Sequence, residues 1–162
     1  MANKIFNWVA NKLIERAKKT PYIHLDGYMK RYWLFNPYQW EDGTHVKRGW
    51  LKNLLPSIRI HHILREDTDR HLHDHPWEAR TVILKGFYIE EKEEDDGKIS
   101  VNLREAGNTA RIRFGQFHRI TEVSHGGVWT LFITYKYIGT WGFNVDGKKI
   151  PFKEYFKQME NE

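Results

Sequence analysis

From Pro21 to about residue 150, glycine-containing turns divide the sequence into short segments of alternating apolar and polar residues. Asp-Gly and Gly-Gly pairs favour the tight turns that join antiparallel strands. Many short strands at regular spacing are typical of an all-β sandwich or barrel. The turn pairs are Asp42-Gly43, Asp96-Gly97, Gly126-Gly127 and Asp146-Gly147.

The clearest strand is the segment 57–64, which alternates and is rich in β-branched residues. Successive side chains of a strand point to opposite faces. One face is predicted to carry Ile58, Ile60, His62 and Leu64, and the other Arg59, His61 and Ile63.

Further strands are predicted over residues 28–35, 81–90, 99–103, 110–113, 118–123 and 128–135. The acidic stretch 90–97 is predicted to be a solvated hairpin tip, with Asp96-Gly97 as its turn. A last hairpin is expected to turn at Asp146-Gly147, and residues 152–162 are expected to form a short helix.

The first twenty residues have a different pattern. Between residues 4 and 19 the apolar positions fall near a 3.6-residue spacing, which predicts an amphipathic helix. Asn3 is the expected N-cap, and Thr20-Pro21 is the expected stop. Packing against the barrel is the favoured interpretation, and a membrane-surface or partner-binding helix is the alternative. The chain is thus predicted to have a helix over 1–20 and one barrel domain over 21–162.

Charge and composition exclude several function classes. Of the net charge of +5, +4 lies in residues 1–20, where five basic residues face one acidic residue. The barrel region therefore has little net charge, which argues against a nucleic-acid partner. The absence of Cys excludes disulfides, thiolate ligands and a cysteine nucleophile. With no apolar run of about 20 residues and no signal-peptide pattern, a soluble cytoplasmic protein without a membrane partner is expected.

Three histidines stand at alternate positions in the segment 70–78, namely His71, His73 and His75. In an extended segment alternate residues point to the same side. Neutral imidazole is the commonest metal-binding side chain, so this cluster predicts a metal site. A polar loop with surface histidines is the alternative interpretation.

With this cluster the sequence resembles the cupin family. His73-Asp74-His75, followed by a strand that ends at Gly86, is similar to the first cupin motif. Gly107, Gly115 and His118 are similar to the second motif, in which Arg113 stands in place of a proline. The resemblance covers about residues 55–140 and implies a double-stranded β-helix, or jelly-roll barrel. The His-Asp-His-Pro-Trp run and the later Trp-Gly-Phe also resemble a group of small bacterial and phage cupins.

The resemblance implies that His73, His75 and His118 are metal ligands. The glutamate of the first motif falls in strict register on Ala79, and the nearest carboxylate is that of Glu78. Because a shift of one residue turns a strand side chain to the other face, Glu78 is a ligand only if the loop before it is tighter or bulged. A site of three histidines resembles the thiol dioxygenases, whereas three histidines and a glutamate resemble most other metal cupins.

Three further residues are candidates for a catalytic role. His71 is either a proton shuttle beside the metal or a solvated side chain at the barrel mouth. Arg113 is either a binder of carboxylate or phosphate or a surface arginine, and Tyr88 is the third candidate. Other polar side chains that are candidates to line a cavity are Arg59, His61, Arg65, Thr81 and Arg111.

The predicted function is that of a metal-binding cupin that acts as an enzyme on a small organic substrate. Histidine ligands with open coordination positions suit Fe(II), and equally Ni, Mn or Zn. An Fe(II) dioxygenase-like activity is favoured. The alternative is a non-catalytic module that binds a small ligand or has a structural role. A homodimer that forms through edge strands is expected.

Overall fold

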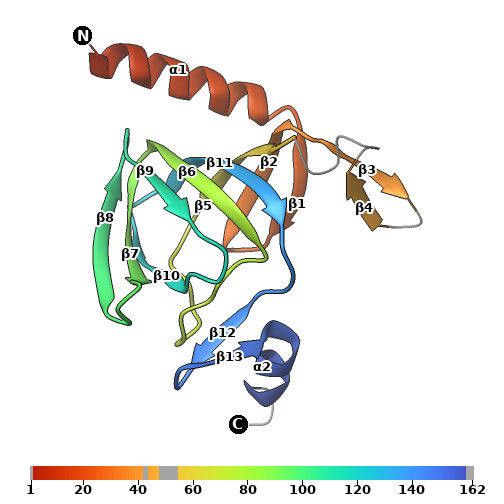
Figure 1. The fold of residues 1–162 in the computed structure, drawn as a ribbon. Coiled ribbons are helices and arrows are strands. Elements are labelled where there is room, and N and C mark those ends of the chain that lie inside the picture. The colour runs from red at the N-terminus through yellow and green to blue at the C-terminus, as the bar shows by residue number, and fades with distance from the viewer. Residues whose placement is uncertain (1, 42–43, 48–54, 160–162) are drawn as a thin grey trace.

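A computed structural model describes residues 2–41, 44–47 and 55–159 of the chain. Its centre is a barrel formed by two facing antiparallel sheets (Figure 1). The larger sheet has the strand order β1-β2-β5-β11-β6-β9. Its strands are β1 (Pro21–Leu25), β2 (Met29–Phe35), β5 (Ser57–Ile63), β6 (Trp77–Lys85), β9 (Thr109–Ile112) and β11 (Val128–Tyr137).

The smaller sheet has the order β10-β7-β8 and closes the other side of the barrel (Figure 1). Its strands are β7 (Phe87–Glu93), β8 (Ile99–Glu105) and β10 (His118–Val123). A separate hairpin of β3 (Tyr38–Glu41) and β4 (Thr44–Lys47) projects from the barrel. The predicted turn Asp42-Gly43 lies outside the described residues. The expected all-β barrel with an N-terminal helix is confirmed.

The predicted faces of β5 are both found in the structure. Ile60 is fully buried beneath the N-terminal helix, whereas His61 and Ile63 lie in the barrel interior. Because β5 pairs with β2 on one side and β11 on the other, its inward side chains are held at the centre of the larger sheet.

The single long strand predicted over residues 81–90 is wrong. The chain forms β6 and β7 instead, and Gly86 between them has a φ of +81°. That conformation favours glycine. A Cβ at this position would also lie 2.5 Å from Ser124 Oγ and 2.9 Å from the Gly127 carbonyl oxygen. Gly86 thus allows the chain to pass from one sheet to the other.

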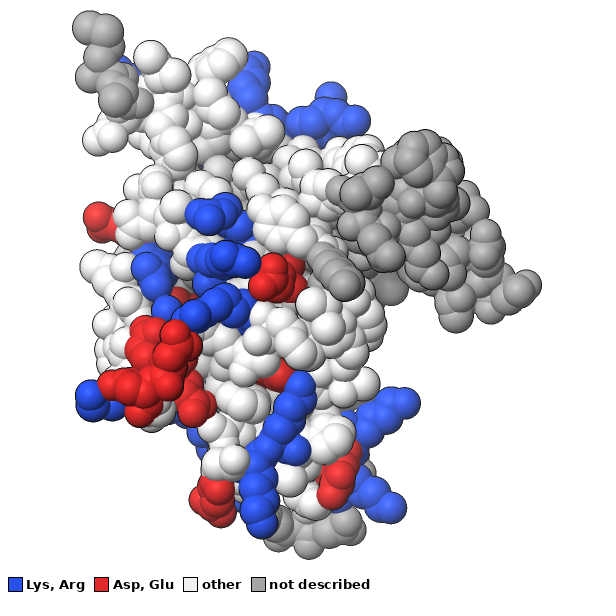
Figure 2. Space-filling model, viewed as in Figure 1, with Lys and Arg blue, Asp and Glu red and all other residues white. Residues whose placement is uncertain are grey.

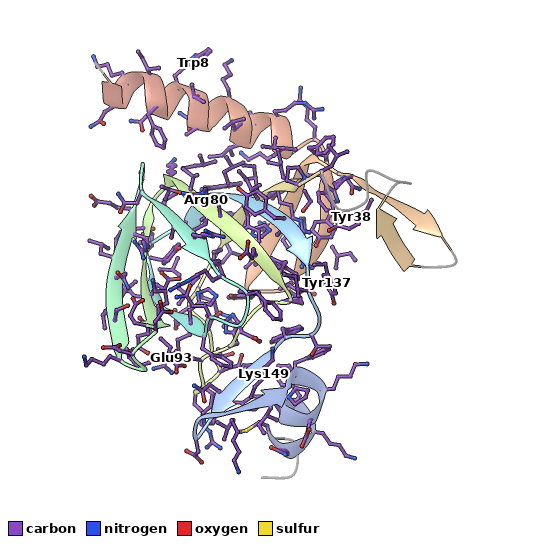
Figure 3. All side chains as sticks on the ribbon, viewed as in Figure 1. Trp8, Tyr38, Arg80, Glu93, Tyr137 and Lys149 are labelled. Atoms are coloured by element: carbon purple, nitrogen blue, oxygen red, sulfur yellow. The ribbon has the colours of Figure 1, made fainter. Side chains whose placement is uncertain are left out.

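Helix α1 (Ala2–Ala17) packs on the outer face of the larger sheet. Ala10, Ile14 and Ala17 contact a buried cluster that includes Ile60. The helix already includes Asn3, so the prediction that this residue is the N-cap is wrong. On the opposite side Trp8 points away from the barrel (Figure 3) and is 62% exposed. In the part of the chain that the structure describes, no helix is long and apolar enough to cross a membrane.

The C-terminal segment forms a hairpin of β12 (Gly142–Val145) and β13 (Lys148–Pro151), followed by α2 (Phe152–Met159). Phe143 is buried and its ring stacks on Tyr155 of α2 with 3.9 Å between ring centroids. Gly142 lies so close to β13 that a Cβ would be 2.2 Å from the Ile150 carbonyl oxygen. The predicted hairpin and terminal helix are both present.

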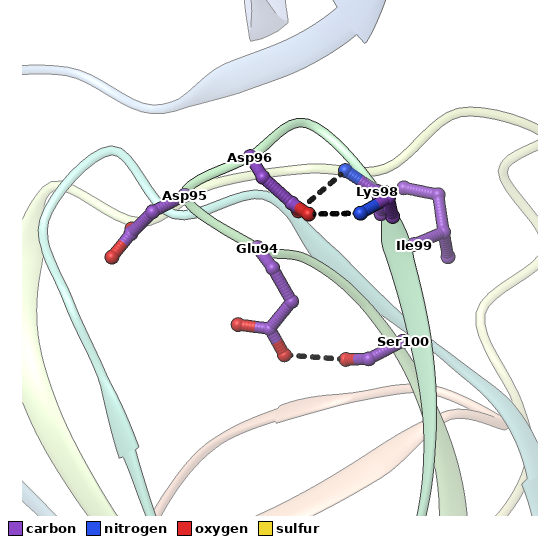
Figure 4. Close-up of a pocket in the computed structure, with 6 residues that line it drawn as sticks. All are labelled: Glu94, Asp95, Asp96, Lys98, Ile99 and Ser100. Carbon is purple, nitrogen blue, oxygen red and sulfur yellow. Dashed lines mark hydrogen bonds and ion pairs between the residues drawn. The ribbon is translucent and has the colours of Figure 1, made fainter.

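Acidic side chains gather at the tip of the β7–β8 hairpin (Figure 2). The tip has Gly97 at a φ of +78°. Asp96 there forms an ion pair with Lys98, and Glu94 accepts a hydrogen bond from Ser100 (Figure 4). The hollow between these side chains is exposed to solvent. The predicted solvated tip is therefore present, but Glu90 lies in β7 with only 2% of its surface exposed.

Candidate metal centre

The loop 71–76 is joined to β10 by its backbone. The N–H of His73 donates to the carbonyl of His118, and the N–H of His118 donates to the carbonyl of His73, both at 2.9 Å. His73 also bridges to Phe143 of β12. This pairing holds the first histidine of the loop beside the histidine that begins β10.

Successive side chains of the loop 71–76 point to opposite sides. His73 and His75 face His118, whereas the fully buried side chain of Asp74 lies on the other side. Asp74 accepts a 2.7 Å hydrogen bond from the Gly142 N–H and forms an ion pair with Lys149. The loop is thus fixed from both sides, which holds the two histidines in place.

The three imidazoles converge. One nitrogen from each of His73, His75 and His118 lies within 4.8 Å of the other two, and Nε2 of His75 is 2.9 Å from Nε2 of His118. Two nitrogens at this separation need a proton or a cation between them. Ligands at ~2.1 Å from one ion lie roughly 3.0–3.4 Å apart, so the donor set fits a single metal ion.

The ring of His118 is oriented by Glu90, a residue that the sequence analysis did not select. Oε1 of Glu90 lies 2.9 Å from Nδ1 of His118, and Nε of Arg104 donates to Oε2 at 3.3 Å. Because an ionised carboxylate only accepts hydrogen bonds, Nδ1 of His118 holds a proton, which leaves Nε2 as the nitrogen that can bind a metal. A carboxylate in this position is the usual partner of a metal-ligating histidine.

The protonation states suit a metal site. Burial lowers the pKa of His73 to about 4, and burial also lowers the pKa of His75 well below 6.5. The neighbouring His118 acts in the same direction on both. Burial opposes ionisation of Glu90, but its hydrogen bond from His118 keeps the pKa of its carboxyl below the ordinary value. At neutral pH His73 and His75 are therefore neutral and Glu90 is charged.

The histidine cluster forms part of the wall of a cavity of about 410 Å³ inside the barrel. Such a volume suits a small organic molecule. Tyr88 lines the cavity, as do the predicted Arg59, His61 and Thr81. Burial raises the pKa of the Tyr88 hydroxyl, which therefore stays protonated. The apolar part of the wall includes Ile63, Ile112, Ile120, Phe132 and Phe143.

The proposal of Glu78 as a fourth ligand is not supported by its position. Trp77 faces the cavity and Ala79 is fully buried in the barrel, so the residue between them points outward. The carboxylate of Glu78 accepts hydrogen bonds from Nη2 of Arg111 at 3.2 Å. The loop is not tightened, and strict register holds, with Ala79 at the position of the family's glutamate.

Two catalytic candidates also lie away from the cavity. Nδ1 of His71 is 2.9 Å from the hydroxyl oxygen of Tyr155, so this ring contacts α2 rather than the other histidines. Arg113 is exposed and pairs with Asp95 at 3.0 Å. Arg65 lies over the ring of Tyr28, and Arg111 pairs with Glu78. None of these four residues lines the cavity in the described part of the chain.

Glu90 was missed because it begins an acidic run that looks like a solvated loop. Its only signal is its spacing of two from Tyr88, since both residues then share the inward face of one strand. Trp77 was missed for a similar reason, because it follows the histidine cluster directly and the strand was expected to begin at residue 81.

No protein-family model and no curated protein matches the sequence. Solved structures do match. The Bacillus subtilis oxalate decarboxylase studied for its Mn(II) centres is 10% identical, with a TM-score of 0.50, over 86% of this chain and 32% of that chain. Oxalate oxidase in complex with glycolate is 18% identical, with a TM-score of 0.48, over 69% of this chain and 60% of that chain.

Fe(II) HppE is 11% identical, with a TM-score of 0.49, over 71% of this chain and 55% of that chain. The chain therefore spans less than two thirds of the length of each of these three structures. At such identities a match is informative about the fold alone. The neighbours are cupin-fold proteins, and the two-sheet barrel described above agrees with theirs. The protein has the cupin fold.

Proposed function

We propose that the protein holds one divalent metal ion with His73, His75 and His118 and is a metal-dependent enzyme for a small organic substrate. The observation that supports this most directly is the convergence of three imidazole nitrogens at the wall of a cavity inside the barrel. Glu90 strengthens the case because it fixes the tautomer of His118.

The donor set favours catalysis over a structural metal. Structural zinc sites have four protein ligands, whereas catalytic sites leave positions open. Among the described residues the group contains three histidines and no carboxylate ligand. A metal ion with open positions beside this cavity would supply Lewis-acid or redox chemistry to a molecule bound there.

We favour Fe(II) and a dioxygenase-like reaction, because imidazole ligands suit iron and the three protein ligands leave coordination positions open, as the ligand sets of non-haem iron oxygenases do. Mn, Ni and Zn suit the same ligands. The roles of the protein are to hold three imidazoles around one ion, to surround the substrate with a largely apolar wall and to keep Tyr88 protonated near the centre. Tyr88 is thus the candidate hydrogen-bond donor to a substrate.

The test is metal analysis of protein purified without chelator or affinity metal, compared with His73→Ala and His118→Ala. About one equivalent of metal is expected in the parent and none in either variant. His125→Ala is the control, because His125 is exposed in the turn before β11. Folding of each variant is checked by circular dichroism.

The protein is next loaded anaerobically with Fe(II), Mn, Ni or Zn in turn, and oxygen uptake is followed with small organic acids, thiols and alcohols. Metal-dependent turnover would support an enzyme. If the parent takes up no metal even after soaking, the proposal is wrong and a non-catalytic ligand-binding module is left. The homodimer and the cytoplasmic location stay predictions.

A further inference from the structure

Three polar atoms in the cavity wall have no hydrogen-bond partner. They are Nε of Arg59, Nε2 of His61 and Nε1 of Trp77, and the described residues contain no other buried side-chain nitrogen or oxygen in this state. All three residues line the cavity beside the histidine cluster. Buried polar groups without partners are rare in folded proteins, so their convergence on one cavity indicates a missing ligand.

The atom types identify what is missing. The arginine Nε and the indole Nε1 are donors only, so their partner must be a hydrogen-bond acceptor. His61 is 7% exposed, and burial, followed by the charge of Arg59, lowers its pKa well below 6.5. The neutral ring can donate from Nε2 as well. The site therefore offers up to three donors to one acceptor group.

The charge of Arg59 indicates that this acceptor is an anion. Its guanidinium lies over the ring of Trp33 at 4.8 Å and the ring of Trp77 at 6.0 Å. Its hydrogen-bond partners are hydroxyl groups, Ser57 Oγ at 3.2 Å and Tyr38. No ion pair to a carboxylate is found for Arg59 among the residues that the structure describes. A partly buried cation without a counter-charge is unfavourable, and an anionic ligand would supply that charge.

These donors lie close enough to the proposed metal for one small molecule to reach both. The ring of Trp77 stacks on His75 with 5.4 Å between centroids. The ring of His61 stacks on Phe132 at 4.8 Å, and both side chains face the same cavity of about 410 Å³. An anionic group held here lies one aromatic ring away from the histidine cluster, so the rest of a small molecule can reach that cluster.

We infer that Arg59, His61 and Trp77 form a subsite for the carboxylate of a small organic acid, next to the metal centre. This inference rests on the proposed function and narrows its substrate class. One guanidinium between aromatic faces matches a flat, singly charged carboxylate, which accepts from several N–H groups in its plane. Arg31 lines the same cavity, so the preference for a carboxylate rests on this planar fit and not on the number of charges.

The test uses binding and not turnover. Benzoate and propionate are titrated into metal-free and metal-loaded protein, with benzamide and propionamide as uncharged controls. Binding is followed by the NMR signal of the Trp77 indole N–H, which is assigned with the Trp77→Phe variant. We expect the carboxylates to shift this signal in both forms of the protein and the amides to leave it unchanged.

Arg59→Met is the test variant, because it keeps the aliphatic stem and removes the charge. Its affinity for the carboxylates should fall about 10- to 100-fold, as expected for loss of a charged hydrogen bond. Arg80→Met is the matched control, because Arg80 is exposed on the outer face of β6 and donates to Thr109. That variant should bind like the parent.

The outcomes separate this inference from the proposed function. If carboxylates bind only the metal-loaded protein and Arg59→Met binds them normally, the acid is a metal ligand and the subsite is wrong. If neither form responds although metal binds, the subsite is also wrong and the metal centre stands. If metal does not bind but carboxylate binding depends on Arg59, the subsite stands and the proposed enzyme is wrong.

Discussion

Oε1 of Glu90 lies 2.9 Å from Nδ1 of His118, so a buried acid on β7 orients the imidazole of the neighbouring strand β10. The Glu90→Gln variant keeps the size of the side chain and removes its charge. We expect the metal affinity to fall about 10- to 100-fold, because such carboxylates fix the tautomer and raise the basicity of the ligand. A competition titration with a chelator measures the change.

Glu78→Gln is the matched control for this prediction. The same substitution is made at an acid three residues after His75 that the sequence leaves open as a fourth ligand. Its carboxylate pairs with Arg111 on the outside of the barrel. Its metal affinity should equal that of the parent. Equal losses in both variants would mean that neither acid has a specific role at the centre.

The second prediction concerns the packing of α1. Ile14 is 5% exposed and contacts the cluster on the outer face of the larger sheet. Ile14→Ala should lower the free energy of unfolding by about 2–4 kcal/mol, as for other large-to-small changes in a core. Ile5 lies on the same helix with 63% of its surface exposed, so Ile5→Ala should have almost no effect. Urea denaturation of both variants is the measurement, and equal effects would contradict the packing.

The third prediction concerns Asp74, which lies between two of the proposed ligands. Asp74→Asn removes a buried charge that pairs with Lys149 and accepts from the Gly142 N–H. The free energy of unfolding should fall by about 1.5–3 kcal/mol, the usual contribution of a hydrogen bond to a charged group. Asp95→Asn is the control, since its exposed pair with Arg113 should contribute less than about 1 kcal/mol.

Acidification should destabilise the metal-free protein. Because the pKa of His73 is about 4 when folded and 6.5 when exposed, the unfolded chain binds more protons between these values. The free energy of unfolding therefore rises with pH across that window. The contribution of His73 is fully present above pH 6.5 and is lost as the pH falls toward 4. His61 and His75, whose pKa values burial also lowers, act in the same direction.

Chemical denaturation in the presence of a chelator, at about pH 7 and about pH 5, measures this dependence. The His73→Gln variant lacks one of the titrating rings and should show a shallower decline. A stability that is constant between the two pH values would show that these rings stay accessible to protons in the folded chain.

Most strands of the barrel can be predicted from the sequence, because apolar and polar residues alternate along them. On β5 the period of two placed His61 and Ile63 on one face and Ile60 on the other. In the structure the first face lines the barrel interior and the second lies beneath α1. The alternation alone did not predict the break at Gly86, because one glycine in an apolar run gives no turn signal, and only the family motif ends a strand there. Its need for glycine comes from the approach of Ser124, which is distant in sequence.

The three histidines of the site could be predicted from the sequence, but the roles of the nearby acids could not. The His-x-His spacing and the second motif bring His73, His75 and His118 together, as expected. The roles of Glu78 and Glu90 depend instead on where β6 begins and on which face of β7 each acid lies. The ring of His71 contacts Tyr155 of α2 instead of the other histidines, and these two residues are more than eighty positions apart in the sequence. Such tertiary contacts leave no local pattern in the sequence.

The fixing of the 71–76 loop on both sides has a consequence for how the protein tolerates changes of length. His73 is bridged to His118 and Phe143, and Asp74 is bonded to Gly142, so the middle of this short loop cannot slide. One inserted residue between His73 and His75 would exchange the inward and outward positions. It would turn a ligand out of the cavity and bring a carboxylate in. For protein engineering, this loop is therefore a place for substitutions only, and insertions belong in the hairpin tip at Asp96-Gly97.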